Sequence, residues 1–398
     1  MRATRRRTPS RGGGIVTVRD VVAALEAAYP PALAESWDAV GLVCGDPDEP
    51  VRRVLVAIDP VAETVAEALD GGAQLLVTHH PLLLRGVHGV PADDPKGALV
   101  HRLVRGGAGL FCAHTNADSA DPGVSDALAA ALGLTVIGPL APRSADALDT
   151  LAVFVPVVDA ERVLAALADA GAGRVGTYGD AAWTVQGTGQ FRPLPGAHPT
   201  TGRVGELVRV PETRIEVVVP RRARRGVLAA LHAAHPYEQP AYDLHEQVDA
   251  DASTGLGRIG ELPEAEPLGA FTDRVAWALP TTAWGVRAAG DPDRPVRRVA
   301  VCGGAGDSLL AAAGSAGVDA YVTGDLRHHP AAEHIAAGGP ALVDVAHWAG
   351  EWPWCAQAAS VIDRALAGTV DVLVSHRRTD PWTIGAAPDD EGDPRGER

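Results

Sequence analysis

The chain has 398 residues, of which 46% are hydrophobic, and its formal net charge is −15. A chain of this length can bury a large core, and ordinary domain sizes predict two or three domains. The acidic balance argues against a nucleic-acid binder, which normally carries a basic excess. The four cysteines are widely separated and form no CxxC pair, which argues against a disulfide framework or a thiolate zinc site and indicates a cytoplasmic protein.

The two ends of the chain are expected to lie outside the folded domains. Residues 1–14 carry five arginines but lack the apolar stretch of a secretory signal, so we predict a disordered arm. Residues 388–398 are polar and acidic, and they predict a disordered tail. No apolar run reaches the roughly 18 to 20 residues that cross a bilayer, so no membrane contact is expected.

Residues 15–145 predict the first half of an α/β domain. Helical spacing alternates with short apolar runs suited to buried strands, which indicates a sheet flanked by helices. The expected order is helix 18–28, strand 51–58, helix 59–69, strand 75–77, helix 97–105 and strand 110–112.

Residues 146–262 predict an inserted ferredoxin-like α+β domain. Two strand-helix passes in about 110 residues fit that fold. The expected elements are strand 151–157, helix 160–170, strand 213–219 and helix 224–232, with a Gly-, Pro- and Thr-rich stretch at 171–205.

Residues 263–387 again alternate helical spacing with short apolar runs, and they predict the second half of the same α/β domain. The expected elements are strand 299–302, helix 308–314, strand 320–323, helix 330–337 and strand 342–345. A weak internal repeat supports one composite domain, because both halves place polar residues directly after buried strands. Sites of α/β folds usually lie at such strand ends.

In the first half, the residues that follow the strands could bind metal. His79 and His80 follow one predicted strand, and His114 and Asp118 follow the next. At a strand-to-loop turn the adjacent imidazoles can converge on neighbouring ions, and a carboxylate can bridge two ions. The alternatives are a hydrogen-bonded histidine pair at a strand end and a helix-capping Asp118.

In the second half, His347 and Glu351 are four residues apart, which puts both side chains on one face of a helical turn. The alternatives are a solvated Glu351 and a partly buried His347. Together with the first-half residues they could hold two ions that share a carboxylate. Imidazole and carboxylate ligands without sulfur suit zinc, iron, manganese, nickel or cobalt.

Three further polar clusters have two interpretations each. Asp325 and His329, beside His328, could orient ligands or transfer a substrate proton, or they could be a helix cap and exposed histidines. Trp37 and Asp38 could line a cleft, or they could be a core residue and a turn residue. Residues 302–307 after a strand could cradle phosphate, or they could form a tight glycine turn without a Walker motif.

With these motifs assembled, the chain resembles the GTP cyclohydrolase 1 type 2 homologues, also called Ngg-interacting-factor-like dinuclear metal proteins, from about Val16 to Trp382. The segments that carry the resemblance are Trp37 to Leu42, Thr78 to Pro81, His114 to Asp118, Val301 to Gly306, Thr323 to Asp325 with His329, and His347 to Glu351. In the insert, Gly187 to Pro193 and His235 to Glu238 resemble the CutA-like or PII-like module of the longer members. Ala39 departs from the Asn that the family usually has there.

The resemblance implies a toroidal homohexamer with two divalent metal ions per subunit. Matched motif by motif, the ligands would be His79, His80, Asp118, His347 and Glu351. In a hydrolase, the catalytic groups would be Asp325 and His329, either of which could transfer the proton. The implied function is a metal-dependent hydrolase that acts on GTP or another nucleotide-like metabolite through an activated water. The alternative is a non-catalytic metal-binding or metal-sensing scaffold with a regulatory PII-like module.

Overall fold

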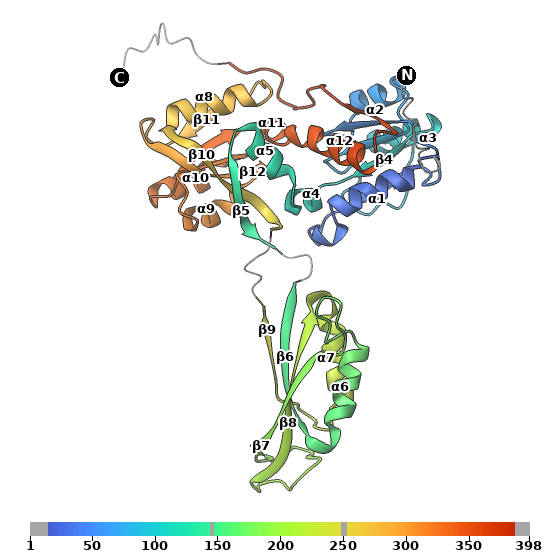
Figure 1. Ribbon diagram of the computed structural model, residues 1–398, viewed down its shortest axis with the longest axis vertical. Coiled ribbons are helices and arrows are strands. Elements are labelled where there is room, and N and C mark those ends of the chain that lie inside the picture. The colour runs from blue at the N-terminus through green and yellow to red at the C-terminus, as the bar shows by residue number, and fades with distance from the viewer. Residues whose placement is uncertain (1–14, 144–146, 248–252, 387–398) are drawn as a thin grey trace, which may run out of the picture. The chain divides into compact units, whose positions relative to one another are not determined.

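The computed structural model describes residues 15–143, 147–247 and 253–386, so the predicted arm and tail lie outside these ranges. The chain divides into two compact units. We call the unit formed by the residues before 144 and after 251 the large unit, and the unit formed by residues 144–251 the insert. Figure 1 shows the elements of each unit. In the described ranges, none of the helices is long and apolar enough to cross a membrane.

The first sheet of the large unit has the strand order β1-β4-β3-β2-β15. Its strands are β1 (Gly41–Cys44), β2 (Arg53–Ala57), β3 (Leu75–Thr78), β4 (Gly109–Cys112) and β15 (Asp371–Val374). All neighbours are parallel except β1, which pairs antiparallel with β4 at the edge. Every residue of β3 and β4 is buried, because helices cover both faces of a parallel sheet.

The second sheet repeats this order as β11-β14-β13-β12 and continues with β10 and β5. Its strands are β5 (Thr135–Pro142), β10 (Gly255–Pro267), β11 (Val286–Ala289), β12 (Pro295–Ala305), β13 (Ala320–Gly324) and β14 (Ala341–Val345). Here β12, β13 and β14 are parallel, and β11 again pairs antiparallel at the edge. The internal repeat predicted from the sequence is therefore present in the strand order.

The helices of the large unit also follow the repeat. In the first half they are α1 (Val18–Ala28), α2 (Ala62–Asp70), α3 (Pro95–Arg105), α4 (Thr115–Ser119) and α5 (Val124–Ala131). In the second half they are α8 (Leu268–Ala278), α9 (Leu310–Ser315), α10 (His328–Ala336), α11 (His347–Glu351) and α12 (Pro353–Ala365). The short 3-10 turns are η1 (Pro31–Leu33) and η4 (Asp307–Leu309).

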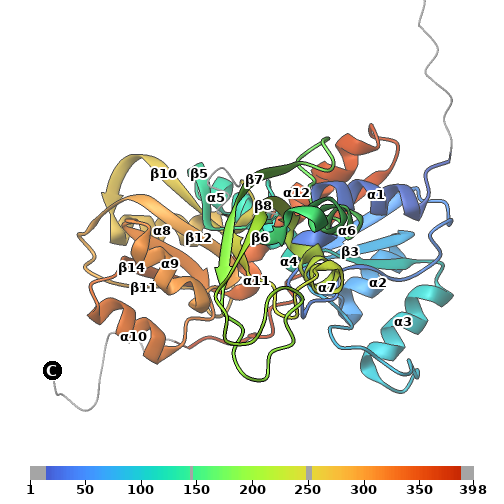
Figure 2. The same ribbon diagram turned by 90° about the horizontal axis from the view of Figure 1, so that it is seen from below.

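The two halves exchange elements, which makes them one folding unit. Helix α5 of the first half packs on β12 and β10, whereas α12 of the second half packs on β2 and β15. The two helices contact each other, and Figures 1 and 2 show them with α4 and α11 between the sheets. A single apolar cluster runs from Val54 and Val56 in β2 through Trp354 in α12 to Val299 and Val301 in β12.

The insert is a four-stranded antiparallel sheet with the order β7-β8-β6-β9. Its elements are β6 (Leu148–Pro156), η2 (Val157–Asp159), α6 (Ala160–Asp169), β7 (Ala182–Phe191), β8 (Val208–Pro220), η3 (Arg221–Ala223), α7 (Arg224–Ala234) and β9 (Tyr242–Glu246). Alternate residues of β6 and β8 meet the apolar faces of both helices in a separate core. This period of two is what one covered sheet face requires.

Three features of the fold differ from the sequence expectation. The domain boundary predicted after residue 262 falls inside β10, which pairs with β5 and β12 in the large unit. The Gly-rich stretch at 171–205 contains β7, which is mostly exposed and therefore lacks the apolar run expected of a strand. Residues 302–305 continue β12 and do not form a loop after it.

Candidate metal centre

Six side chains from three strand ends converge between the two sheets of the large unit. His79 and His80 follow β3, and His114 follows β4 as the N-cap of α4, which carries Asp118. His347 begins α11 after β14, and Glu351 ends that helix. The carboxyl ends of parallel strands share one edge of a sheet, and the exchange of α5 and α12 between the halves brings the two edges together.

Glu351 is the centre of this cluster. Its Oε1 lies 3.4 Å from His79 Nε2 and 3.1 Å from His347 Nε2, and its Oε2 lies 3.0 Å from His80 Nε2. On the other side, Asp118 Oδ1 lies 3.6 Å from His79 Nε2. His80 Nε2 and His347 Nε2 are 3.3 Å apart, so residues of the two halves touch directly.

Each of the four imidazoles is held through its other ring nitrogen. The Nδ1 atom of His80 lies 2.7 Å from Asp59 Oδ1, and that of His79 lies 2.9 Å from the carbonyl oxygen of Ala113. An oxygen partner at Nδ1 requires a proton there, because carboxylates and carbonyls only accept hydrogen bonds. In a neutral ring the Nε2 atom is then free to bind metal.

The remaining two imidazoles have the same arrangement. His114 Nδ1 lies 2.9 Å from Asp38 Oδ1, and Asp38 is fixed in turn by the backbone N–H and hydroxyl of Thr115. His347 Nδ1 lies 2.7 Å from Asp325 Oδ2. Asp325 has φ 55°, a conformation that non-glycine residues seldom adopt. Such paired imidazoles and carboxylates are typical of metal sites.

The cluster is buried on one side and open on the other. The side chains of His79 and Glu351 are 0% and 4% exposed, whereas that of His347 is 34% exposed. Trp37, which is 58% exposed, lies edge-on to His114 with ring centroids 6.0 Å apart. A small molecule could therefore reach the cluster at His347.

Burial and mutual charge shift the pKa values of the central groups in opposite directions. Burial lowers the pKa of His80, but the carboxylates of Glu351 and Asp59 outweigh it and raise that pKa to about 10. Glu351 and Asp325 similarly overcome burial and raise the pKa of His347 to about 11. Burial raises the pKa of Glu351, yet the three imidazoles hold it well below its usual range. Without metal, protons on the imidazoles thus balance the carboxylate.

Among the outer groups, burial decides the direction of the pKa shift for Asp118 and His114, whereas charge decides it for His79. Burial raises the pKa of Asp118 to about 6. Burial, together with the charge of His79, lowers the pKa of His114 to about 4. Burial also lowers the pKa of His79, but Glu351 and Asp118 outweigh it and raise that pKa. The lowered pKa keeps the imidazole of His114 neutral, the form that binds metal, at neutral pH.

Two glycines leave room for Glu351 and His347. A Cβ at Gly304, where φ is +68°, would lie 2.3 Å from Glu351 Oε1. A Cβ at Gly324 would lie 3.2 Å from the Cα of His347. Gly304 at the end of β12 and Gly324 at the end of β13 thus serve close packing against α11.

The structure brings together the five residues of the motif-matched ligand set and places beside them His114, which the strand-end pattern also indicated. Asp325 contacts His347 but not the carboxylates. His329 is exposed, and the contact described for it is with the ring of His328, so it is not brought into the cluster. Sequence reasoning missed Asp59 as a partner of His80, although its place directly after β2 matches the strand-end rule used for the histidines.

The donor set fits a divalent metal. Two groups have ligand atoms within 4.8 Å of one another, namely His79, His80 and His114, and then His80, His347 and Glu351. His79 Nε2 and Glu351 Oε2 are buried without a well-aligned hydrogen-bond partner in the protein. Buried polar atoms of this kind normally have partners, so an ion bound between them would satisfy both. The structure therefore shows a buried His/Glu group that could hold metal.

Comparison with known proteins supports the same assignment. The family model described as Duf34/NIF3 (NGG1p interacting factor 3) matches residues 16–381. The chain is 57% identical over 371 residues to the "GTP cyclohydrolase 1 type 2 homolog" of Mycobacterium tuberculosis, which covers 93% of this chain and 97% of that protein. It is 55% identical over 368 residues to the protein of that name from Mycobacterium leprae, with coverages of 92% and 95%.

Solved structures agree with the fold. A Bacillus cereus protein related to NIF3 aligns with a TM-score of 0.63 and 36% identity, covering 94% of this chain and all of that one (100%). A Staphylococcus aureus protein aligns with a TM-score of 0.65 and 26% identity, with coverages of 93% and 99%. Since the match extends over both halves of the large unit and the insert, the chain belongs to the Duf34/NIF3 family, whose curated relatives are named GTP cyclohydrolase 1 type 2 homologs.

Proposed function

We propose that the cluster holds two divalent metal ions and that the protein is a metal-dependent hydrolase of GTP or another nucleotide-like metabolite. The observation that carries the proposal is a set of four imidazoles with their Nδ1 atoms tied to oxygens, of which His79, His80 and His347 also turn their Nε2 atoms to Glu351. A structural histidine pair would not need this arrangement at every ring.

The ligands divide between the two halves. His79, His80 and His114 form one group, while His80, His347 and Glu351 form the other, so His80 is common to both. Asp118 completes the first group through its contact with His79. Two divalent ions held there would supply an activated water and an electrophile for hydrolysis. Zinc, iron, manganese, nickel and cobalt all suit these ligands.

The residues around the cluster would serve the reaction in distinct ways. Asp38, Asp59 and Asp325 hold three of the imidazoles in position. Asp325, whose side chain is 57% exposed beside His347, could hold a proton for a leaving group. His329 has no place in this mechanism, because it does not reach the cluster.

An exposed aromatic ring beside His114 supports a substrate with a planar group. The ring of Trp37 offers a face on which a base could stack. The name of the curated relatives refers to GTP, and the match with the Mycobacterium tuberculosis protein covers 93% of this chain. GTP is therefore the first substrate to test, and other nucleotides come next.

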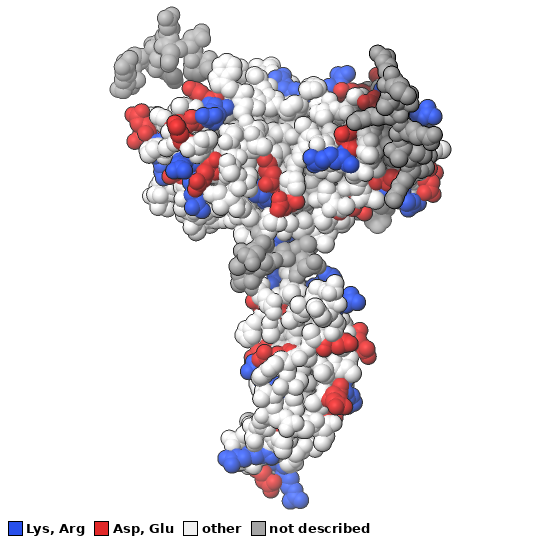
Figure 3. Space-filling model, viewed as in Figure 1, with Lys and Arg blue, Asp and Glu red and all other residues white. Residues whose placement is uncertain are grey.

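The family resemblance also leads us to propose that the insert is ferredoxin-like, in the manner of CutA and PII, and that the protein is a cytoplasmic homohexamer. The βαββαβ element order and the antiparallel strand order β7-β8-β6-β9 support the first part. On the face shown in Figure 3, basic and acidic side chains of the described residues are interspersed, which favours a small-molecule substrate over nucleic acid.

Elemental analysis of the purified protein, coupled to a screen of nucleotides for metal-dependent turnover, tests the proposal. We expect about two ions per chain and formate release from GTP, or hydrolysis of another nucleotide. Metal without turnover on any nucleotide would favour the alternative of a metal-binding scaffold. A chain that retains no divalent metal after purification and reconstitution would contradict both.

A further inference from the structure

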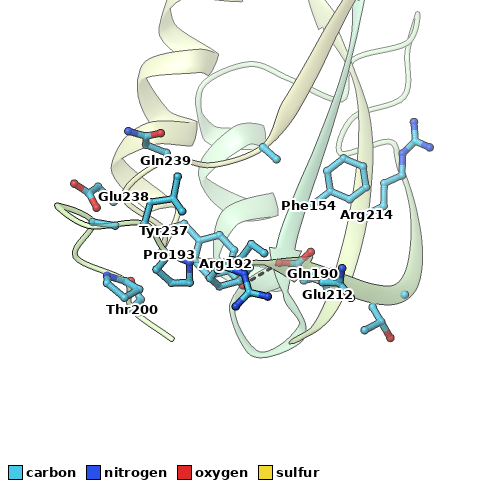
Figure 4. Close-up of a pocket in the computed structure, with 18 of the residues that line it drawn as sticks. Phe154, Gln190, Arg192, Pro193, Thr200, Glu212, Arg214, Tyr237, Glu238 and Gln239 are labelled. Atoms are coloured by element: carbon cyan, nitrogen blue, oxygen red, sulfur yellow. Dashed lines mark hydrogen bonds between the residues drawn. The ribbon is translucent and has the colours of Figure 1, made fainter. Parts of the chain in front are cut away.

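A pocket of about 880 Å³ lies within the insert, far in sequence from the histidine cluster. Its walls come from β7, the proline-rich loop 192–200 and the turn 237–241, and β6 and β8 add Phe154, Glu212 and Arg214 (Figure 4). Small-molecule sites typically have volumes of about 300 to 1,000 Å³. The pocket is therefore large enough for a metabolite.

A buried carboxylate without a cation faces this pocket. Glu212 is 8% exposed, and its Oε1 accepts a hydrogen bond of 2.9 Å from the hydroxyl of Tyr237. Within the described ranges, Glu212 has no ion pair, because the nearby Arg214 lies 2.6 Å from Glu216 instead. Burying an unpaired carboxylate is costly, and such groups usually have a partner in the functional state.

The neighbouring histidine does not supply that partner. His235 Nε2 lies 2.9 Å from the carbonyl oxygen of Phe154, while its Nδ1 accepts from the backbone N–H of Tyr237 at 3.0 Å. A ring that donates at one nitrogen and accepts at the other is neutral. Burial lowers the pKa of His235, consistent with that state. The negative charge of Glu212 therefore remains available to a ligand.

The walls around Glu212 suit a flat ligand. The rings of Phe191 and Tyr237 pack edge to face with centroids 5.6 Å apart, and Phe154 lies on the other side of Glu212 in Figure 4. A Cβ at Gly189 would lie 1.9 Å from Glu212 Oε2, so only glycine allows the carboxylate to stand there. Nothing lies within 4 Å of the Cβ position of Gly187, which keeps the wall beside it open.

From this arrangement we infer that the insert binds a small molecule through a planar group with two adjacent N–H donors, which Glu212 accepts while aromatic rings cover its faces. A guanidinium group and the amino edge of a guanine-type base share this chemistry. A carboxylate accepts two parallel N–H bonds from such a group with good geometry. The site uses no residue of the histidine cluster and needs no metal.

The test is calorimetric titration of the full chain in the presence of a chelator. Arginine and guanosine are the probes, and lysine and adenosine are their controls, because neither control presents two adjacent N–H donors in a plane. We expect one probe to bind and its control to bind at least about tenfold more weakly, since an unmatched buried polar group loses its hydrogen bonds. Whether arginine or guanosine binds identifies the source of the group.

Glu212→Gln keeps the shape of the side chain but removes the charge and one acceptor, so it should weaken binding by at least about tenfold. Glu206→Gln makes the same change at an exposed loop position outside the pocket and should leave binding unchanged. The inference is wrong if neither probe binds at about 1 mM, the weak end of specific affinity. It is also wrong if Glu212→Gln binds as tightly as the parent.

Hydrogen exchange on the unsubstituted protein keeps the test decisive if Glu212→Gln does not fold. Bound ligand should slow exchange in residues 185–200 and 237–241, which line the pocket. Slowed exchange confined to the strand ends of the large unit would instead place the ligand at the histidine cluster and overturn the inference. The chelator separates the two proposals, because the insert should bind its ligand whether or not the large unit binds metal.

Discussion

Two buried carboxylates in this protein, Glu351 in the large unit and Asp149 in the insert, have opposite surroundings. Glu351 lies among three imidazoles, and its Oε2 lacks a well-aligned partner. Asp149 is fully buried, but Arg224 donates to both of its oxygens, at 2.7 and 2.8 Å, and Arg221 donates to one at 3.2 Å. A buried carboxylate whose oxygens are all hydrogen-bonded to protein side chains is typical of a structural ion cluster. A buried carboxylate that lacks a partner and lies among titratable groups is typical of a ligand site.

The partners also differ in what they can release. Guanidinium groups stay protonated at all accessible pH values, so the cluster around Asp149 cannot accept a metal. Imidazoles can give up their protons, and metal binding then replaces protons by ions. The same degree of burial therefore fits a structural role at Asp149 and a ligand-binding role at Glu351.

The largest effect is expected from Glu351→Gln. The amide keeps the shape but loses the charge that three imidazoles share, so the chain should retain at most one ion, measured by elemental analysis after dialysis. The matched change Asp118→Asn should cost less metal, because the contact of the Asp118 carboxylate with the cluster is a longer one, 3.6 Å to His79 Nε2. Thermal unfolding in chelator should show that both variants fold. Equal metal content in Glu351→Gln and the parent would remove Glu351 from the site.

A second large effect is expected from Gly304→Ala. The new methyl group would overlap Glu351 Oε1 and push the carboxylate from the cluster, so metal content should fall almost as far as in Glu351→Gln. Gly317→Ala is the matched control, because Gly317 has a similar φ of +63° but nothing within 4 Å of its Cβ position. That control should lose only about 1 kcal/mol of stability and no metal. Similar metal content in the two variants would show that Gly304 does not shape the site.

A moderate effect on stability is expected from Asp149→Asn. The side-chain hydrogen bonds and charges of Arg224 and Arg221, which burial opposes, hold the pKa of Asp149 below its usual range. A carboxyl with a lowered folded pKa contributes stability that is present above its unfolded pKa and lost as pH falls through the folded value. Asp149→Asn should therefore destabilise the insert at pH 7, by about 3 kcal/mol, and the difference from the parent should shrink below about pH 4.

Pulsed hydrogen exchange of β6 and β8 across a urea series measures this loss without interference from the large unit. Asp243→Asn, at an exposed position on β9, serves as the control and should change little. Metal content should be unaffected in both variants. A pH-independent difference between Asp149→Asn and the parent would show that packing, and not charge, is what Asp149 contributes.

The sequence predicts much of this site because strand-end chemistry is local. His79 and His80 follow an apolar run, and the spacing of His347 and Glu351 is that of one helical turn, so both motifs are visible without a structure. The repeat in the sequence also predicts that two similar halves meet, and the matching strand orders confirm it.

The rest depends on contacts between segments that no local pattern relates. Asp38 and Asp59 are ordinary loop residues until the fold places them at 2.9 and 2.7 Å from imidazole nitrogens. The exchange of α5 and α12 between the halves leaves no periodic signal, because each helix is amphipathic whichever sheet it covers. Strand β7 was missed because exposure on a sheet edge removes the apolar run that marks buried strands.

The smallest effect is expected from Asp325→Asn, and it sharpens the contrast between structural and functional charges. Asp325 is 57% exposed on its side chain and holds His347 through a single hydrogen bond of 2.7 Å, whereas Asp38 is held by Thr115 as well as His114. Metal affinity should fall by about tenfold in Asp325→Asn, which is the lower end of the loss typical for residues that orient a metal ligand. The loss of affinity should be larger in Asp38→Asn. Competition with a chromogenic chelator measures the affinity of both variants, and Asp363→Asn, exposed on α12, is the control.

Because an orienting role acts through metal affinity, excess metal should restore full occupancy of the site in Asp325→Asn. If affinity is unchanged there while Asp38→Asn loses it, the carboxylate at the open side is not an orienting group, and its contact with His347 would instead serve proton transfer.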